Sequence, residues 1–317
     1  MSNAALILFL VYYEDTCAEG SKDSGIYNGS NLGAPSVAEA VVDLQSAGGC
    51  IIELQARSRF VAREHDLLVL RCPFKHLGDA TSNAQLEHCR QLAADFSRSR
   101  TTDIVMLIST HASSNDGGLL YKPGGLVSLN EMLKHILGTM SLRMFNKSML
   151  FVLCCGGLVR HDFQEVRDAT RWFEGVFAFD APLLDSIHIC LHFVSTVLDY
   201  GVFGEESIWS SFLRATKFEV VKHADVYLAV ENTVYRARDA KWRRSPNGEI
   251  IKCSVCDKEA KYGEYLERSN IIKFRCCVDG HPSNVPRNIY VNLLQEEPRK
   301  RWILGGRGQP RFMIDLV

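Results

Sequence analysis

Two short stretches of sequence decide the fold. Residues 102–112 read TDIVMLISTHA, and residues 147–157 read KSMLFVLCCGG. Each contains a continuous apolar run of strand length, as is typical of strands buried on both faces of a parallel sheet. The first run leads into His111, and the second leads into Cys155, which two glycines follow. Because ligands bind at the carboxyl edge of such sheets, the pattern predicts an imidazole and a thiol side by side at that edge.

Strand-like and helix-like segments alternate along the first 230 residues. The expected strands cover residues 6–13, 66–72, 148–153, 175–180, 225–230 and the run that ends at His111. The expected helices cover residues 35–47, 81–98, 129–140, 187–200 and 205–215. We expect Gly48 and Gly49 to end the first helix. Strands joined by helical crossovers form a parallel sheet with helices on both faces, so the sequence predicts an α/β fold with a mostly parallel, six-stranded sheet.

Length and composition fit a soluble globular protein with one large domain, or one domain and an appendage. The chain has 317 residues, of which 46% are hydrophobic and 23% are charged. The longest apolar run, residues 4–13, is too short to span a bilayer, so no membrane partner is expected. The 11 cysteines are odd in number and scattered, unlike a disulfide framework. This usage favours a reducing compartment, the cytoplasm, with the nucleus as the alternative.

Charge divides the chain into an acidic body and a basic end. Residues 236–317 hold 17 Lys and Arg against 10 Asp and Glu, whereas residues 1–235 hold 19 against 27. The stretch 236–248 is polar and basic and contains the turn signal Ser245-Pro246-Asn247-Gly248. We therefore expect a domain at 1–235, a linker at 236–248 and a basic module at 249–317.

The basic module carries a candidate metal site. Cys253 and Cys256 form a C-x2-C turn, and a second turn further on contains Cys276, Cys277 and His281. Two pairs of such ligands give the tetrahedral S/N set that zinc prefers, and residues 258–274 between them can form a hairpin. Either Cys276 or Cys277 fits as the third ligand. The tighter turn favours Cys253, Cys256, Cys277 and His281 around a structural zinc ion, in an arrangement that resembles a small zinc ribbon. The alternative is a set of free thiols in a reducing cell.

A thiol beside an imidazole is the minimum for cysteine nucleophile chemistry. The thiolate attacks a carbonyl, and the histidine stabilises the thiolate and protonates the leaving group. Adjacent strand residues face opposite sides of a sheet, so Cys154 is expected to be a buried apolar residue rather than a partner of Cys155. Cys190 is expected to be buried in the same way.

The order of these segments resembles the caspase and metacaspase superfamily of cysteine peptidases. Residues 103–111 are similar to the family's histidine segment and residues 150–157 to its cysteine segment, and residues 116–121 and 31–35 resemble two of its loops. The resemblance covers residues 5–235 and implies a caspase-like three-layer sandwich. It departs at Ala112, where the family has glycine, and at Val37, where it has an acid. No arginine lies between Tyr13 and Arg57 to bind an aspartate side chain, as the family's first loop does.

The resemblance implies a cysteine endopeptidase with His111 and Cys155 as a catalytic dyad. The backbone N–H groups of Ala112 and Cys155 would stabilise the oxyanion. Asp180 matches the position of a substrate-pocket acid, which would favour Arg or Lys before the cleaved bond. The expected partner is therefore a protein or peptide substrate.

Two other functions are compatible with the sequence. The departures at Ala112 and Val37 suggest a catalytically inactive scaffold of the same fold that acts by protein–protein interaction. The basic module, with Arg299-Lys300-Arg301 near Trp302, suggests binding to nucleic acid through phosphate contacts. The sequence favours the peptidase over both, and a basic face packed on the acidic body over a nucleic-acid partner.

Overall fold

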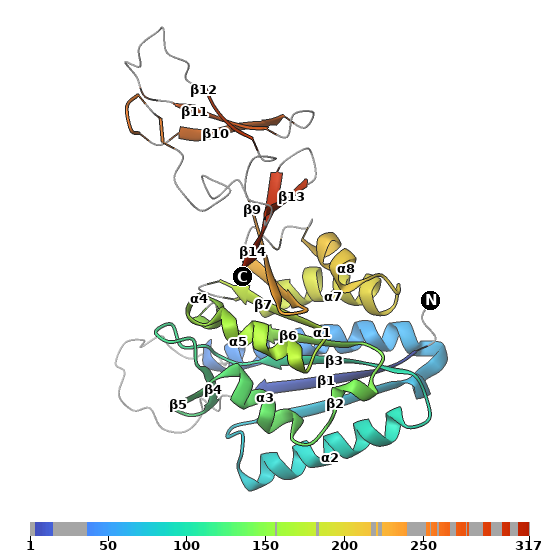
Figure 1. Cartoon of the computed structure of the whole chain (residues 1–317). Helices are drawn as coiled ribbons and strands as arrows, with labels where there is room; N and C mark the ends of the chain where they lie inside the picture. Colours follow the sequence, from blue (N-terminus) through green and yellow to red (C-terminus); the bar gives the residue numbers. More distant parts are fainter. Residues whose placement is uncertain are drawn as a thin grey trace, which may run out of the picture.

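One large sheet dominates the computed structural model (Figure 1). The structure describes residues 4–14, 37–155, 157–181, 184–216, 220, 224–239, 252–253, 255–258, 260–266, 271–276, 278, 288–292, 300–304 and 310–316. Within these residues the sheet has nine strands in the order β13-β14-β9-β8-β7-β6-β3-β1-β2.

Parallel strands form one half of this sheet, with β2 as its outermost strand. They are β1 (Ala5–Tyr13), β2 (Leu67–Phe74), β3 (Thr102–Ser109), β6 (Ser148–Leu153) and β7 (Gly175–Asp180), and β8 (Asp225–Val230) follows antiparallel to β7. Every residue of β3 and β6 is buried, because helices cover both faces of these strands. The six predicted strands and the α/β class are therefore confirmed.

Helices form a layer on each face of the sheet. One layer holds α2 (Ala80–Ser97), α3 (Leu129–Leu137), α4 (Gly157–His161) and α5 (Phe163–Asp168). The other holds α1 (Val37–Phe60), a helical run of α6 (Ser186–Ile189), η4 (Cys190–Val194), α7 (Ser195–Val197) and η5 (Leu198–Val202), and α8 (Ile208–Ala215). In Figure 1, α3 and α5 lie in front of the strands and α1 lies behind them. Shorter elements are η1 (Val61–Asp66), η2 (Leu142–Met144), η3 (Ala169–Arg171) and the hairpin of β4 (Leu119–Lys122) and β5 (Gly125–Val127).

Alternate residues of the central strands pack into two separate apolar cores, one on each face of the sheet. Ile104, Met106 and Ile108 of β3 join the core under α2 and α3, whereas Val105 and Leu107 join the core under α1 and α8. This period of two explains why residues 104–108 of β3 are apolar on both faces. Among the described helices, none is long and apolar enough to cross a membrane.

Gly48 and Gly49 lie inside α1 and do not end it. A Cβ added at Gly48 would lie 3.1 Å from Cys190 Sγ and 3.2 Å from the carbonyl oxygen of Ser186. Gly48 therefore allows α1 to pack closely against the helical run that begins at α6. The prediction that these glycines end the helix was wrong, because contact with the neighbouring helix offsets the cost of a helical glycine, about 1 kcal/mol relative to alanine.

The C-terminal part of the chain contributes to the main sheet. β9 (Thr233–Asp239) pairs with β14 (Pro310–Leu316), which pairs with β13 (Lys300–Leu304), all antiparallel. The sheet therefore extends beyond the six predicted strands, and β9 runs through the first four positions of the predicted linker. The rest of that linker, residues 240–248, lies outside the described residues. The division of the chain into domains at 1–235 and 249–317 stays a prediction.

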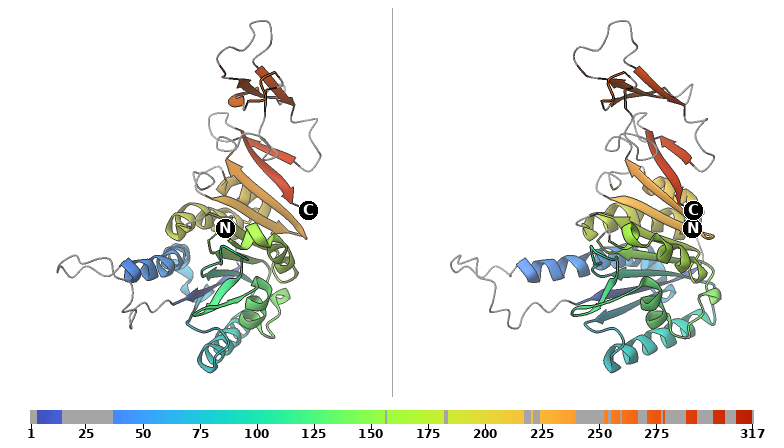
Figure 2. Two further views of the ribbon diagram at one scale, coloured as in Figure 1. Left: turned by 90° about the vertical axis from the view of Figure 1, so that its left-hand side faces the viewer. Right: turned by 60° about the vertical axis from the view of Figure 1, so that its left-hand side comes forward.

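A second, smaller sheet is formed by β10 (Ala260–Leu266), β11 (Ile271–Cys276) and β12 (Asn288–Asn292). β10 and β11 are antiparallel, which confirms the hairpin predicted over residues 258–274. Figure 2 shows these strands on the far side of β13 and β14 from the helices.

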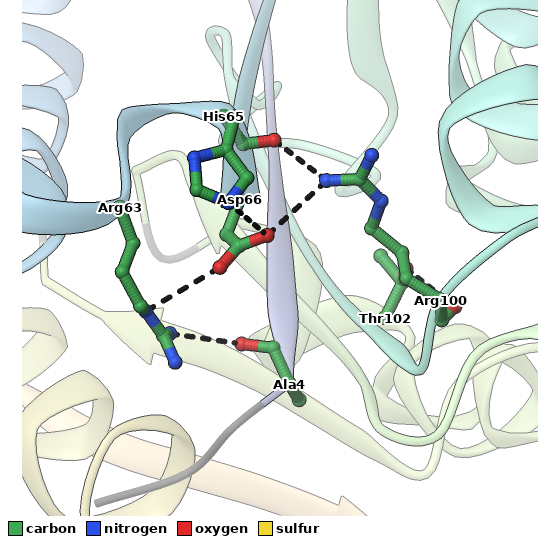
Figure 3. A network of polar contacts seen from close by, with 6 residues as sticks. All are labelled: Ala4, Arg63, His65, Asp66, Arg100 and Thr102. Atoms are coloured by element: carbon green, nitrogen blue, oxygen red, sulfur yellow. Dashed lines mark hydrogen bonds and ion pairs between the residues drawn. The ribbon is translucent and has the colours of Figure 1, made fainter.

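The amino edge of the main sheet is held by a polar network (Figure 3). The Asp66 carboxylate lies 3.2 Å from Arg100 Nη1 and 3.4 Å from Arg63 Nε. Arg63 Nη2 also donates to the carbonyl oxygen of Ala4 at 3.5 Å, and Arg100 Nη1 donates to that of His65 at 2.6 Å. These contacts tie the start of β1 to η1 and to the turn before β3. The predicted site lies at the opposite, carboxyl edge.

Candidate active site

The strand register brings His111 and Cys155 to the same level of the carboxyl edge. β3 and β6 are parallel neighbours in which Ser109 pairs with Leu153, and the Thr110 N–H donates to the carbonyl oxygen of Leu153 at 3.1 Å. His111 and Cys155 each follow their paired residue by two positions. Since neighbouring strands lie about 4.8 Å apart, the two backbones are close enough for an imidazole and a thiol to meet. The catalytic roles of these two residues stay a prediction.

The loop after β3 is folded tightly onto itself. The Thr110 hydroxyl donates to the carbonyl oxygen of Leu120 at 2.7 Å, and the Leu120 N–H donates to that of His111 at 2.9 Å. The Ser113 hydroxyl and the Gly118 N–H hydrogen-bond to Asp116, and they hold the pKa of that carboxyl below its usual range. These bonds fix the backbone that carries His111.

Ala112 presents its backbone N–H away from this hairpin. It pairs with Leu119 in a single antiparallel bridge. The hydrogen bonds around the bridge run between its flanking residues, with Ser113 N–H donating to the carbonyl oxygen of Gly118 at 2.8 Å. Ala112 therefore occupies a non-hydrogen-bonded position, so its N–H points away from Leu119. Within the part of the chain that the structure describes, this N–H has no backbone acceptor.

Gly157 allows the loop after His111 to touch the segment after Cys155. A Cβ added at Gly157 would lie 2.1 Å from the carbonyl oxygen of Ser113 and 3.6 Å from the Ala112 Cβ. His161 Nε2, one turn further along α4, lies 2.7 Å from the carbonyl oxygen of Ser114. The second glycine after the cysteine is therefore required by this close approach. Gly156 lies outside the described residues.

The two adjacent cysteines differ in their surroundings. Cys154 is buried, and burial raises the pKa of its thiol far above the usual range, as it also does for Cys190. Both thiols are therefore unreactive, which confirms the prediction that they are apolar core residues. Cys155, one position later, is partly exposed at the edge of the sheet. Of the two, Cys155 is the one that a substrate can reach.

Asp180 lies at the carboxyl end of β7, but its charge is already paired. Arg160 of α4 places Nε 2.6 Å from Asp180 Oδ1, while the Asp180 side chain is only 7% exposed and that of Arg160 is 47% exposed. The sequence analysis missed Arg160. No local pattern marks it, because the pair joins a helix to a strand 20 positions later and exists only in the folded chain.

A hollow of about 280 Å³ lies between the segments that follow His111 and Cys155, although neither of these two residues lines it. It is lined by Asp116 and Gly118 from the loop after His111, and by Leu158 and Asp162 from the segment after Cys155. A larger cavity of about 430 Å³ lies at the opposite edge, between Leu6, Phe60 and Phe203. Its described lining contains no cysteine, serine or histidine.

Three cysteines come together in the C-terminal part. The Sγ atoms of Cys253, Cys256 and Cys276 all lie within 4.8 Å of one another, and the Cys256–Cys276 pair is 3.5 Å apart. The Cys253 N–H donates to the carbonyl oxygen of Lys258 at 2.8 Å, and the Asp257 N–H donates to that of Cys253 at 2.9 Å, which closes a tight turn around the first two. These three thiols could bind a metal ion.

The third sulfur of this cluster belongs to Cys276. β11 extends through Cys276, where it pairs with Ala260 of β10, so the hairpin itself carries this sulfur to the turn. The sequence left Cys276 and Cys277 open as the third ligand and favoured Cys277 for its tighter turn; the part of Cys277 stays a prediction. Cys277 and His281 lie outside the described residues. Tetrahedral zinc with Zn–S bonds of about 2.3 Å separates its sulfurs by about 3.8 Å, so the cluster fits that ion.

No protein-family model, curated protein or solved structure matches this chain. The chemistry of the site therefore has to be inferred from its own residues.

Proposed function

We propose that this chain is a cysteine endopeptidase in which His111 and Cys155 form a catalytic dyad. The observation that carries the proposal is the register of β3 and β6. It ends both strands at the same level of the sheet, and His111 and Cys155 each follow two residues after the last paired residue. A thiol and an imidazole at neighbouring strand ends form the kind of pair in which an imidazole can activate a nucleophile. The contact between Gly157 and Ser113 supports the same arrangement, because it holds the two segments together.

The reaction follows from these groups. Cys155 Sγ, as a thiolate, forms a bond to the carbonyl carbon of the peptide, and the carbonyl electrons move onto oxygen. That oxyanion would be stabilised by the N–H groups of Cys155 and Ala112. Collapse of the tetrahedral intermediate breaks the C–N bond, and His111 donates its proton to the leaving amine. Water, deprotonated by His111, then hydrolyses the thioester and releases the carboxylate and the thiolate.

We propose that the fold is a caspase-like three-layer sandwich. The order of elements supports this. Parallel strands are covered by helices on both faces, a histidine follows β3, a cysteine follows its sheet neighbour β6, and β8 is antiparallel to β7. A protein or peptide is the substrate that fits this chemistry. The buried free thiols among the described cysteines suit a reducing compartment such as the cytoplasm.

The metal that best suits the cysteine cluster is zinc in a structural role. Cys253, Cys256 and Cys276 would supply three thiolates, and the chain after β11, which carries Cys277 and His281, would supply the fourth ligand. Bound zinc would hold the turn at Cys253 against β11 and stabilise the small sheet. The ion would take no part in peptide hydrolysis, since the reactive residues lie on the main sheet.

Selective alkylation tests the dyad without knowledge of the substrate. We expect Cys155 to react with iodoacetamide at mildly acidic pH, well below the thiol pKa of about 8.5, because an adjacent imidazolium favours the thiolate. Cys50 is the internal control, since it is the more exposed of the two thiols. The His111→Ala variant should slow the reaction at Cys155 and leave that at Cys50 unchanged.

Peptide cleavage gives the direct test. We expect wild type to cut members of a mixed peptide library and Cys155→Ala to cut none while it keeps the same unfolding temperature. If Cys155 reacts no faster than Cys50 and no peptide is cut in a Cys155-dependent way, the chain is instead a catalytically inactive scaffold of the same fold.

A further inference from the structure

A cavity at the amino edge of the main sheet is a second candidate binding site. It has a volume of about 430 Å³ and lies between the starts of β1 and β3, the end of α1 and the turn after η5. Leu6 of β1 pairs with Asp103 of β3, so these two lining residues stand side by side at this end of the sheet. Because the predicted active site lies at the opposite edge, this cavity takes no part in the proposed peptide hydrolysis.

Apolar residues make up most of the described lining of the cavity. Leu6, Phe60 and Val202 are buried, each at most 3% exposed, and Phe203 is partly exposed. The ring planes of Phe60 and Phe203 cross at 69°, with their centroids 6.0 Å apart. Ligand pockets are lined in this way, mainly by apolar and aromatic side chains with a few polar groups among them.

The charges around the cavity are balanced within the protein. Arg59 Nη2 lies 2.7 Å from Asp199 Oδ1, and Arg63 is paired with Asp66 (Figure 3). The Asp103 carboxyl is buried, and burial raises its pKa, which makes it a poor partner for a cation. Each arginine of the described lining already has a carboxylate partner. An ionic ligand would therefore lose its hydration without gaining an unpaired counter-charge.

The backbone of one wall departs from standard geometry. The Phe203 N–H donates to the carbonyl oxygen of Leu198, five residues earlier, at 2.9 Å, so η5 is a turn of π-helix. Glu205 has a φ of 59°, in the left-handed region that few non-glycine residues adopt. Both features are rare and are concentrated at functional sites of proteins. They stand beside the two residues of η5 that line the cavity, Asp199 and Val202.

We propose that this cavity binds a small, uncharged, apolar molecule with two or three aromatic rings. A dry cavity of about 150 Å³ holds one benzene molecule, so about 430 Å³ has room for two or three rings. Such a ligand would cover the apolar wall and place its rings against those of Phe60 and Phe203, because aromatic rings favour offset or edge-to-face contacts with one another. The inference goes beyond the proposed peptidase and does not depend on it.

The test uses the full chain and the dye N-phenyl-1-naphthylamine, an uncharged three-ring molecule whose fluorescence rises in apolar surroundings. We expect saturable binding of a single dye molecule and a higher unfolding temperature in its presence. The analogue 8-anilino-1-naphthalenesulfonate has the same rings and a negative charge, and it should bind at least about tenfold more weakly. The three-ring cation 10-methylacridinium should also bind at least about tenfold more weakly.

Two variants locate the site. Ala62 is an exposed residue of the lining, so Ala62→Trp narrows the cavity and should abolish saturable binding. Phe203→Leu removes a ring and should weaken binding about 2- to 10-fold, the range that an aromatic pair supplies. Ala84→Trp is the matched control, because Ala84 is an exposed alanine of α2 on the other face of the sheet. That variant should bind the dye as wild type does.

Loss of binding in Ala62→Trp but not in Ala84→Trp supports the proposal. Unchanged binding in folded Ala62→Trp places the dye elsewhere and overturns it. If the unfolding temperature without dye shows that Ala62→Trp does not fold, Phe203→Leu decides in the same way. A wild-type chain that does not bind the dye, or that binds either charged dye as tightly as the neutral one, also overturns the proposal.

Discussion

Replacement of Gly157 by alanine should separate the two segments that carry the proposed dyad of His111 and Cys155. The new methyl group would lie 2.1 Å from the carbonyl oxygen of Ser113, and an ordinary contact begins at about 3.4 Å, so the segments must move apart by about 1.3 Å. Overpacking of this kind costs about 1–3 kcal/mol of stability. A misplacement of about 1 Å in a catalytic pair lowers the rate by about 100-fold. We therefore expect a loss in kcat much larger than the loss in stability explains.

Urea unfolding and the alkylation rate of Cys155 measure the two effects separately. Gly49→Ala is the control. Gly49 lies inside α1, and a Cβ added there would have only Leu10 of β1 as a neighbour, at 3.6 Å. That variant should be unchanged or stabilised by up to about 1 kcal/mol, the helix propensity difference between the two residues. If Gly157→Ala unfolds at the wild-type urea concentration and Cys155 reacts at the wild-type rate, the two segments are not in contact as described.

Three further predictions concern other parts of the molecule. Burial raises the pKa of Asp103, so the folded chain holds this proton more tightly and loses stability as pH rises from the unfolded pKa through the folded one. Asp103→Asn should therefore be more stable than wild type at pH 7 and nearly equal to it at pH 3. Urea unfolding at both pH values measures this, and the same difference in unfolding free energy at pH 3 and pH 7 would contradict it. Cys276→Ser should lose bound zinc in elemental analysis while Cys89→Ser, a buried thiol of α2, keeps it, and zinc retained by Cys276→Ser would rule out that ligand. Deletion of residues 300–317 should expose the edge of β9 and cause self-association in light scattering, because an unpaired edge strand pairs with other chains; a monomeric product would show that the edge is protected in another way.

The central strands were predictable because a strand buried on both faces has an unbroken run of apolar residues. β3 and β6 are apolar at each position within the strand core, and their length excludes helices of typical size. β14 has no such continuous apolar run. Its sequence mixes arginine, aspartate and apolar residues, and its partner β9 lies more than 70 positions earlier. Nothing local therefore indicates that this strand joins the main sheet.

The candidate site divides in the same way. His111 and Cys155 were found because each directly follows a buried strand, and parallel strands bring their carboxyl ends together. The ion pair between Asp180 and Arg160 could not be predicted, because the two residues lie on different elements, and the substrate-binding role of Asp180 stays a prediction. Cys276 joins the cysteine cluster because the hairpin register of β10 and β11 carries it there, and that register cannot be read from the spacing of the cysteines.

Because β14 pairs with β9, the small sheet of β10, β11 and β12 is an insertion between two strands of the main sheet and not a C-terminal tail. The chain leaves the main sheet after β9 and returns to it in β13 and β14, so both ends of this insertion are held by strands of the main sheet. A single cut at residues 241–246, where the basic stretch Lys241-Trp242-Arg243-Arg244 lies, would therefore not shed the downstream fragment. The two pieces would stay associated through the β9–β14 ladder and would part only under denaturing conditions. A nicked molecule would run as one species in gel filtration and as two in a denaturing gel.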